Sequence, residues 1–470
     1  MKIRLIAVLA FCLVLGLAFP SYGGIRTGEE WMGISLNGKK IGYAVNRVEK
    51  TESGYSITEE TDTTITVMGV VQEVRTVTVS DHDDRLGLKG FRFKMTAGAV
   101  GTDITGTVAG DSINLVIETM GNVQMQAVRF KERPHLSGDI EPYMIMQGME
   151  AGKKFNLPFF DPATLSIQHM DITVEAREDM KLGDLLVPSY RIREEFAGVT
   201  SISWISPVAG AVKGEGPMGM TYLREPREQA ISIPAGGYQP VDLIALTSIK
   251  AAGMKIGEPR QAKYFKARLS GVDLSALDVS GGRQVFNNGI LTVVEEDVNA
   301  IKPVRLPVTV PALDKFLAPE PFIQSDDPKI VAKAKEITAG EDDALKAARK
   351  ICEWVFRSME KRFSAGIPNA AEVLRTLSGD CNEHTALFTA LARAAGIPAR
   401  MNGGIVMMDG RLYYHAWPDV YAGSWVSVDP TFGQFPADAT HVRLVQGGFD
   451  RYVDIIRLVG NLKVEVLEYK

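Results

Sequence analysis

Residues 378–388, Ser-Gly-Asp-Cys-Asn-Glu-His-Thr-Ala-Leu-Phe, combine a tight loop with the first turns of a helix and place Cys381 where the two meet. From Cys381 to Ala395 apolar residues recur at helical spacing, and Gly396-Ile397-Pro398 predicts the end of the helix. The first residues of a helix carry unpaired backbone N–H groups and the positive end of the helix dipole, which stabilise a thiolate. We therefore expect Cys381 to be a reactive thiol.

A structural cysteine in the core is the alternative for Cys381, because free cysteines are among the most buried residues. Its closest neighbours in sequence are all polar, namely Asp380, Asn382, Glu383 and His384. These neighbours argue against burial in apolar surroundings, so a reactive thiol is the preferred interpretation.

The first 23 residues have the composition of a secretory signal peptide. Lys2 and Arg4 precede an apolar run from Leu5 to Phe19, and Ser21-Tyr22-Gly23 places small residues ahead of a cleavage site after Gly23. The apolar run is short for a membrane span. We expect a periplasmic or secreted protein, with membrane attachment only if this segment stays uncleaved.

The size and charge of the chain set further limits. With 470 residues and 45% hydrophobic content, the chain predicts several folded domains. Removal of Lys2 and Arg4 with the signal peptide leaves 50 of the 52 basic residues against 57 acidic ones, a net charge of about −7. Such an acidic balance gives no reason to expect a nucleic acid partner.

The mature chain keeps two cysteines, Cys352 and Cys381, which could form a disulfide in an oxidising compartment. Cys352, however, lies on a single apolar helical stripe within residues 342–362, together with Leu345, Ala348, Val355 and Met359. We therefore expect Cys352 in the core and no bond between the two sulfurs.

Residues 24–230 are predicted to form an antiparallel β domain. Trp31 to Leu36 and Ile41 to Glu49 flank Asn37-Gly38, a dipeptide typical of a two-residue hairpin turn. Further runs rich in β-branched residues follow, and no helical period of useful length appears before about residue 240.

This β region offers little that indicates chemistry. Asp81-His82-Asp83-Asp84 has the residue types of a metal site, but four consecutive residues in a turn cannot all face one ion. We predict a solvated turn there. His135 and His169 have no companions in sequence, and the region is assigned to substrate presentation or partner binding.

The remaining chain divides in two. Residues 231–321 are rich in proline and glycine, which predicts a small β-module or a structured linker. Residues 322–470 begin with helices, the first introduced by Asp327-Pro328, a typical N-cap and first helical residue. Strands follow from Arg400, with a hairpin turn at Asp409-Gly410. The result is a multidomain chain with an all-β N-terminal region and an α+β C-terminal domain.

Two further residues in this domain have the types needed to assist a thiol. His415 lies in the middle of a predicted strand, and Asp429 ends the next one. A three-residue loop would place Asp429 opposite His415 (loop 421–423) or diagonal to it (loop 422–424), on the same face of the sheet. A two-residue loop would place the two side chains on opposite faces.

Together, Cys381, His415 and Asp429 have the residue types of a nucleophile, a base and an orienting carboxylate. Taken singly, His415 also fits a core histidine beside aromatic residues, and Asp429 also fits a strand-end cap before Pro430. The order Cys, His, Asp favours the catalytic interpretation, because the same order recurs in papain-like chemistry.

Several separated blocks of the sequence, in order, resemble the core of the transglutaminase-like superfamily, in its bacterial exported branch. They are Gly379 to Thr385, Ala392 to Arg400, Tyr414 to Trp417 and Trp425 to Gly433. The resemblance covers about residues 320–450. It implies a papain-like α+β fold and carries the catalytic roles onto Cys381, His415 and Asp429. Because the superfamily includes amide hydrolases and peptidases as well as acyl transferases, it does not imply protein crosslinking.

The implied reaction is acyl transfer, in which Cys381 attacks an amide carbonyl and His415 protonates the departing amine. The backbone N–H of Cys381 is one expected oxyanion donor, and Trp417 and Gln434 are candidates for the cleft wall. A metal set of Cys381, His384 and His415 would lack a clear fourth ligand. No calcium-loop pattern appears, and we expect no cofactor and no metal.

Three function classes follow from these residues. The preferred one is an exported cysteine peptidase or amidohydrolase acting on a peptide or protein, with cell-envelope peptides as one source. A crosslinking transglutaminase is the second, and a non-catalytic envelope binding or scaffold protein that uses the β region is the third. Residue types and spacing leave the acyl acceptor, water or an amine, open.

Overall fold

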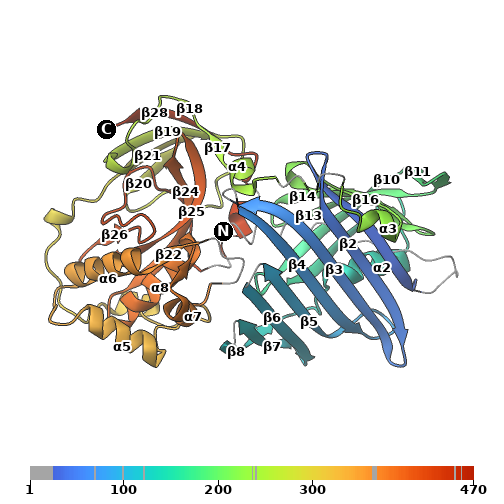
Figure 1. Ribbon diagram of the computed structural model, residues 1–470, viewed down its shortest axis with the longest axis horizontal. Helices are drawn as coiled ribbons and strands as arrows, with labels where there is room; N and C mark the ends of the chain where they lie inside the picture. Colours follow the sequence, from blue (N-terminus) through green and yellow to red (C-terminus); the bar gives the residue numbers. More distant parts are fainter. Residues whose placement is uncertain are drawn as a thin grey trace. The chain divides into compact units, whose positions relative to one another are not determined.

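The computed structural model describes residues 25–67, 70–97, 100–119, 122–234, 237–238, 241–362, 368–448, 451, 453–456 and 458–470. Two compact units divide between Leu246 and Thr247 (Figure 1). The predicted signal peptide, residues 1–23, lies outside the described residues. In the described part of the chain, no helix has the length and apolar character that a membrane crossing requires.

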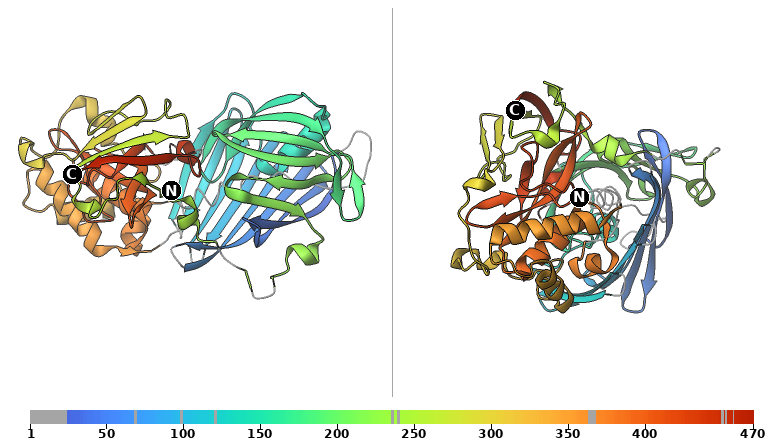
Figure 2. Two further views of the ribbon diagram at one scale, coloured as in Figure 1. Left: turned by 90° about the horizontal axis from the view of Figure 1, so that it is seen from above. Right: turned by 60° about the vertical axis from the view of Figure 1, so that its left-hand side comes forward.

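One 14-stranded antiparallel sheet forms most of the N-terminal unit, and its strands follow the order β8-β7-β6-β5-β4-β3-β2-β1-β16-β15-β14-β13-β10-β9. Figure 2 shows that this sheet is strongly curved. Its strands are β1 (Gly28–Leu36), β2 (Lys39–Thr51), β3 (Gly54–Val67), β4 (Val70–His82), β5 (Leu88–Ala97), β6 (Val100–Ala109), β7 (Ser112–Thr119), β8 (Asn122–Arg129), β9 (Lys154–Asp161), β10 (Ser166–Arg177), β13 (Tyr190–Phe196), β14 (Val199–Ser206), β15 (Gly210–Glu215) and β16 (Met220–Arg224). Short elements complete the unit, namely α2 (Ser137–Gln147), β11 (Met180–Leu182), β12 (Leu185–Val187), η1 (Pro217–Gly219), α3 (Arg227–Ala230) and α4 (Leu243–Thr247), the last of which ends at the division.

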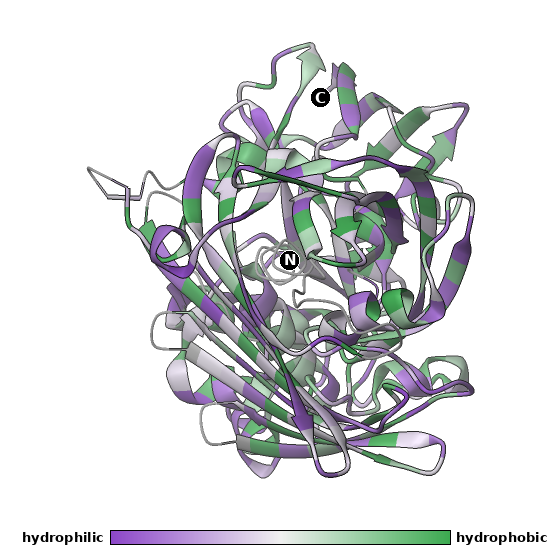
Figure 3. Ribbon diagram, turned by 90° about the vertical axis from the view of Figure 1, so that its right-hand side faces the viewer, coloured by the Kyte–Doolittle hydropathy of each residue, from purple (hydrophilic) through white to green (hydrophobic). Residues whose placement is uncertain are grey.

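The strands of this unit form because hydrophobic and polar residues alternate along them (Figure 3). In β7, Ile113, Leu115 and Ile117 are buried while the residues between them face solvent. The predicted hairpin at Asn37-Gly38 is confirmed, since both residues have positive φ and Leu36 pairs with Lys39.

Helix α2 contradicts the expectation of no helix before residue 240. Its sequence lacks a helical period because it is buried on several sides, with Gly138, Asp139, Ile140 and Met144 among its buried residues. Pro142 lies inside the helix and further weakens the signal in the sequence.

The prediction of a solvated turn at residues 81–84 is wrong for His82. This histidine ends β4 and is 1% exposed, with Nε2 2.9 Å from Ser80 Oγ and Nδ1 3.4 Å from Asp139 Oδ2. Asp139 also lies 3.1 Å from His135 Nδ1, so His135 has a companion that the sequence did not indicate. The turn itself is formed by Asp83, whose Oδ1 accepts hydrogen bonds from the backbone N–H groups of Arg85 and Gly87.

In the C-terminal unit, helices accompany two five-stranded sheets and a two-stranded sheet formed by β22 and β23. One five-stranded sheet has the order β17-β25-β24-β27 with β26 paired to β25, and the other the order β18-β28-β19-β21-β20. The strands are β17 (Ile249–Lys250), β18 (Ala252–Gly253), β19 (Tyr264–Ser270), β20 (Gln284–Asn287), β21 (Ile290–Val294), β22 (Glu360–Lys361), β23 (Ser378–Gly379), β24 (Ala399–Met408), β25 (Arg411–Tyr421), β26 (Trp425–Ser427), β27 (Val442–Gln446) and β28 (Lys463–Tyr469). The helices are η2 (Pro259–Gln261), η3 (Val298–Ala300), η4 (Pro311–Phe316), α5 (Pro328–Ile337), α6 (Ala344–Ser358), α7 (Ala370–Thr376), α8 (Cys381–Ala394) and α9 (Val453–Ile456).

Helix α8 is the central helix of this unit, because it contacts α5, α6 and α7 as well as β24 and β25. Residues 387, 388 and 391 of its apolar side are completely buried. The fold class predicted from the sequence, an all-β N-terminal region and an α+β C-terminal domain, is confirmed. The boundaries at residues 230 and 321 stay predictions. Strands β19 to β21, from the predicted 231–321 segment, share a sheet with β28 at the C-terminal end of the sequence.

Candidate active site

Cys381 is the first residue of α8, as its sequence predicted. Asp380 is the N-cap: its carboxylate accepts a hydrogen bond from the backbone N–H of Asn382 at 2.8 Å. The carboxylate of Glu383 in turn accepts from the backbone N–H of Asp380 at 2.8 Å, which completes a capping box. Gly379 permits this arrangement, because a Cβ at that position would collide with the Glu383 side chain. The loop therefore fixes the position of the thiol.

The surroundings of Cys381 are polar, as the sequence predicted, but they are also buried, which the sequence did not predict. Cys381 is 4% exposed, and Asn382, Glu383 and His384 are each 3% exposed or less. Burial and the nearby charge of Asp380 raise the pKa of Glu383 well above its ordinary value. The polar run of the sequence thus forms an internal hydrogen-bonded network around the start of the helix instead of a solvated surface.

His415 lies in β25, and its relation to Asp429 follows from the turn after that strand. Tyr421 pairs with Trp425, so the loop comprises residues 422–424 and Asp429 lies diagonal to His415. His415 Nε2 lies 2.8 Å from Asp429 Oδ2. The prediction that these two side chains leave the same face of the sheet is confirmed.

The loop after β26 holds Asp429 from several sides. Its Oδ1 accepts hydrogen bonds from the backbone N–H groups of Thr431 at 2.7 Å and Phe432 at 3.0 Å. Reciprocal backbone hydrogen bonds of 2.9 Å between Asp429 and Gln434 close the loop. The ring of Phe432 stacks on His415 with 4.9 Å between centroids, so this loop supplies both a hydrogen-bond partner and a flat contact to the imidazole.

The electrostatics of the pair favour a charged carboxylate and a protonated imidazole. Burial raises the pKa of Asp429, but the charges and hydrogen bonds of His415 and His441 outweigh it and hold that pKa well below its ordinary value. Burial lowers the pKa of His415, whereas the charge of Asp429 and hydrogen bonds to Asp429 and Cys381 raise it above the ordinary value. Since Nε2 faces Asp429, Nδ1 is the ring nitrogen left for the Cys381 thiol.

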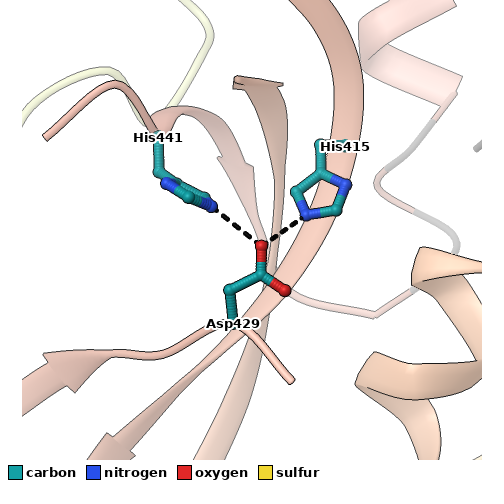
Figure 4. A group of neighbouring side chains, drawn as sticks. All are labelled: His415, Asp429 and His441. Carbon is teal, nitrogen blue, oxygen red and sulfur yellow. Dashed lines mark hydrogen bonds and ion pairs between the residues drawn. The ribbon is translucent and has the colours of Figure 1, made fainter. Parts of the chain in front are cut away.

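A fourth residue of the site, His441, was not predicted from the sequence. It precedes β27 and is fully buried, and its Nε2 lies 2.9 Å from the same Asp429 Oδ2 that His415 contacts (Figure 4). A signal was present in the sequence, because three of the six histidines, His384, His415 and His441, fall within residues 384–441.

The two expected cleft residues have other contacts. Trp417 is 1% exposed, and its ring stacks on His415 at 6.1 Å and meets His441 edge-on at 5.2 Å. Gln434 donates through Nε2 to the backbone carbonyl of Arg260 at 3.1 Å. Trp417 thus packs both histidines in place, and Gln434 links two segments of the unit.

Cys381, His384 and His415 do not form a group of metal ligands in the part of the chain that the structure describes. His384 places Nδ1 2.7 Å from the carbonyl of Asp380, and burial lowers the pKa of His384. The group with suitable ligand atoms, among the residues that the structure describes, is instead His415, Asp429 and His441, with those atoms within 4.8 Å of one another. Both nitrogen-to-oxygen distances in this group are hydrogen-bond lengths, so an ion would have to replace two imidazole protons.

Cys352 behaves as predicted. It lies on α6 and is 1% exposed. Neither Cys352 nor Cys381 forms a disulfide. Burial raises the pKa of the Cys352 thiol far above its ordinary value. The two thiols of the C-terminal unit therefore lie in different environments: Cys352 is on α6 in the core, and Cys381 is beside the imidazole of His415.

Comparison with known proteins identifies the class of this region. Residues 331–430 match the model of the transglutaminase-like superfamily, a span that contains Cys381, His415 and Asp429. The chain is also 36% identical over 99 residues to an uncharacterised protein of Haemophilus influenzae, a match that covers 20% of this chain and 26% of that protein. The chain thus matches about a quarter of the length of that relative, and the C-terminal unit contains a transglutaminase-like domain.

Solved structures show weaker similarity. A candidate cysteine protease from Cytophaga hutchinsonii is 14% identical with a TM-score of 0.29, covering 44% of this chain and 86% of its own. A β-barrel-like protein of a domain of unknown function from Brucella abortus is 9% identical with a TM-score of 0.35, covering 43% and 97%. Both scores are too low to support an argument about this chain.

Proposed function

We propose that this protein is an exported cysteine enzyme that performs acyl transfer on amide bonds, as a peptidase or amidohydrolase, through Cys381, His415 and Asp429. The observation that carries the proposal is the buried hydrogen bond of 2.8 Å between His415 and Asp429, with Cys381 interacting with the same imidazole. These are the contacts that a nucleophile, a base and an orienting carboxylate require. The signal-like residues 1–23 support export.

In the proposed reaction, the Cys381 thiol gives its proton to His415, and its sulfur forms a bond to the amide carbonyl carbon. The oxyanion is stabilised by the backbone N–H of Cys381 at the start of α8. When the intermediate collapses, the carbon–nitrogen bond breaks and His415 transfers its proton to the departing amine. Water then attacks the thioester carbonyl carbon and passes a proton to His415. The carbon–sulfur bond breaks, His415 returns the proton to the sulfur, and the acid product leaves.

Thiol alkylation with iodoacetamide followed by peptide mass spectrometry provides a test that needs no substrate. We expect rapid labelling of Cys381 in the native protein and no labelling of Cys352, whose surroundings disfavour the thiolate. Cys381→Ala should abolish native labelling. Cys352→Ala is the matched control and should leave the labelling of Cys381 unchanged.

Turnover is then tested with a pool of fluorogenic peptide amides, and separately with casein and a fluorescent primary amine. Cleavage that is lost in Cys381→Ala supports the hydrolase. Incorporation of the amine without cleavage would assign a crosslinking transglutaminase instead. Native labelling no faster at Cys381 than at Cys352, with no turnover in either assay, would contradict the proposed function.

A further inference from the structure

His441 contacts an acceptor through each of its two ring nitrogens. Nε2 lies 2.9 Å from Asp429 Oδ2, and Nδ1 lies 3.2 Å from the backbone carbonyl and 3.4 Å from the carboxylate of Asp438. Carbonyl and carboxylate oxygens accept hydrogen bonds, so each nitrogen must carry a proton to make its contact favourable. The geometry therefore describes a fully buried imidazolium between two aspartates.

The charges around this cation balance. Asp438 also lies 2.9 Å from the guanidinium of Arg260, so Arg260, Asp438, His441 and Asp429 alternate in sign along a continuous chain of contacts. Burial lowers the pKa of His441, but Asp438 and Asp429 raise it above its ordinary value, which agrees with the proton count. A buried charge of this kind is stable only when it is paired and hydrogen-bonded on each side.

His415 shares the last member of this chain. Its Nε2 and that of His441 both approach Asp429 Oδ2 (Figure 4). A carboxylate that is already neutralised by one cation attracts a second proton less strongly. The other titratable groups near the two histidines are Cys381 and His384 on α8, Cys352 on α6, Asp438 in the preceding loop and Arg260 in η2.

We propose that His441 is a positioning residue, a buried imidazolium that shares the Asp429 carboxylate with His415 and limits how tightly Asp429 holds a proton on His415. The inference rests on the proposed function, since it gives His441 its effect through the base of that reaction. With His441 in place, His415 stays able to release its proton to the departing amine. Without it, Asp429 acts on His415 with its full charge.

The protonation states can be measured directly by NMR of protein labelled with ¹⁵N in the histidine rings. At pH 7 we expect both ring nitrogens of His441 to carry protons, and His384 to be neutral with its proton on Nδ1. In His441→Gln, which keeps a hydrogen-bond donor but removes the charge, the titration midpoint of His415 should rise by about one pH unit, a tenfold gain in proton affinity.

Two further variants sharpen this test. Asp438→Asn removes the second negative charge beside His441 but keeps the backbone carbonyl of Asp438. The imidazolium of His441 should therefore lose its proton at a lower pH than in the wild type, and the His415 midpoint should again rise. His384→Gln replaces a buried histidine whose Nδ1 contacts the backbone carbonyl of Asp380, and should leave the His415 midpoint in place. Melting curves establish that each variant is folded.

A neutral His441 at pH 7 would overturn the proposal, as would a His415 midpoint that is unchanged or lowered in both His441→Gln and Asp438→Asn. If both variants fail to fold, the wild-type spectrum still decides the charge of His441. The spectra require no turnover, so they remain informative if Cys381 proves unreactive. That result would contradict the proposed function but not the charge state of His441.

Discussion

Two buried carboxylates differ in the side chains that donate hydrogen bonds to them. Glu194 in the N-terminal unit has neutral hydroxyl donors, and Asp429 in the C-terminal unit has two imidazoles. Glu194 is 5% exposed and accepts from the hydroxyls of Ser201 and Ser203 at 3.0 and 2.9 Å. Burial, only partly offset by these bonds, raises the pKa of Glu194. Asp429 is fully buried, yet its pKa is lowered, because two imidazoles and two backbone N–H groups surround it.

The comparison shows that burial alone does not set the charge of an internal carboxylate. At these two carboxylates, the neutral hydroxyl donors of Glu194 do not offset the loss of hydration, whereas the two imidazoles beside Asp429 do. A second group of the N-terminal unit follows the first pattern: Glu59 accepts from the Ser137 hydroxyl, and burial raises the pKa of Glu59 to about 7. The C-terminal unit thus maintains a fixed negative charge at the proposed site, and the N-terminal unit keeps two carboxyl groups toward their neutral form.

The largest effect is expected from Asp429→Asn, which removes the charge that two histidines share. Breaking a buried ion pair leaves uncompensated charge, so the free energy of unfolding of the C-terminal unit should fall by about 3–5 kcal/mol. His415 loses the group that orients it, and alkylation of Cys381 by iodoacetamide should slow by about tenfold or more. Hydrogen exchange of α8 and β25 measures the stability, and mass spectrometry the alkylation.

A matched control exists on the same strand as His415. Asp419 is 3% exposed and accepts from Arg400, Asn402 and Ser427, without contact to either histidine. Asp419→Asn should therefore lower stability while the alkylation rate of Cys381 stays close to that of the wild type. Equal loss of alkylation in both variants would mean that Asp429 acts only through the stability of the unit.

Glu194→Gln should have the opposite sign. The pKa of Glu194 is raised in the folded state. Such a carboxyl group contributes its full stability to the fold at pH values below its unfolded-state pKa, and this contribution is lost as pH rises through its folded-state pKa. The amide cannot ionise, so at pH 8 the N-terminal unit of the variant should be more stable than the wild type by about 1–2 kcal/mol, the desolvation penalty of a buried polar group. Urea unfolding at pH 5 and pH 8 measures the difference.

The adjacent Glu195, which is exposed on β13, gives the control that removes the same formal charge. Glu195→Gln should change stability by only a few tenths of a kcal/mol at either pH. The contribution of Asp429 to stability has the opposite pH dependence, because its pKa is lowered in the folded state. This contribution is present above the unfolded-state pKa and is lost as pH falls through the folded-state pKa. If Glu194→Gln lowers stability at pH 8, the contrast between the two carboxylates is wrong.

The features predicted correctly from sequence are mostly local. The capped helix that begins with Cys381, the Asp327 cap of α5 and the hairpin at Asp409-Gly410 depend on residues close together in the chain. Strand periodicity made the relative faces of His415 and Asp429 depend on the length of the loop between their strands, and the structure selects the three-residue loop 422–424, which places both on one face. Local sequence thus sufficed to place Cys381 at the start of α8 but not to fix the relative direction of His415 and Asp429.

What the sequence did not predict depends on contacts between distant segments. His441 meets Asp429 only because β27 pairs with β24, and Arg260 reaches Asp438 from a segment that was interpreted as a β-module or linker. His82 and Asp139 approach each other from β4 and α2, a helix that has no clear period. Hydrophobic patterning does not determine which buried polar groups become neighbours, so these clusters required the fold.

The smallest expected effect concerns the loop before Cys381. Asp380→Ala removes the N-cap of α8 and should lower the free energy of unfolding by about 1 kcal/mol, with a few-fold change in the alkylation rate because the first turn loosens. Asp380→Asn is the control, since an amide oxygen can still accept from the N–H of Asn382 and should preserve both quantities. Both Asp380→Ala and Asp380→Asn remove the negative charge of Asp380, which helps to raise the pKa of Glu383. Stability should then become less dependent on pH than in the wild type, and an unaltered pH dependence would show that burial alone raises the pKa of Glu383.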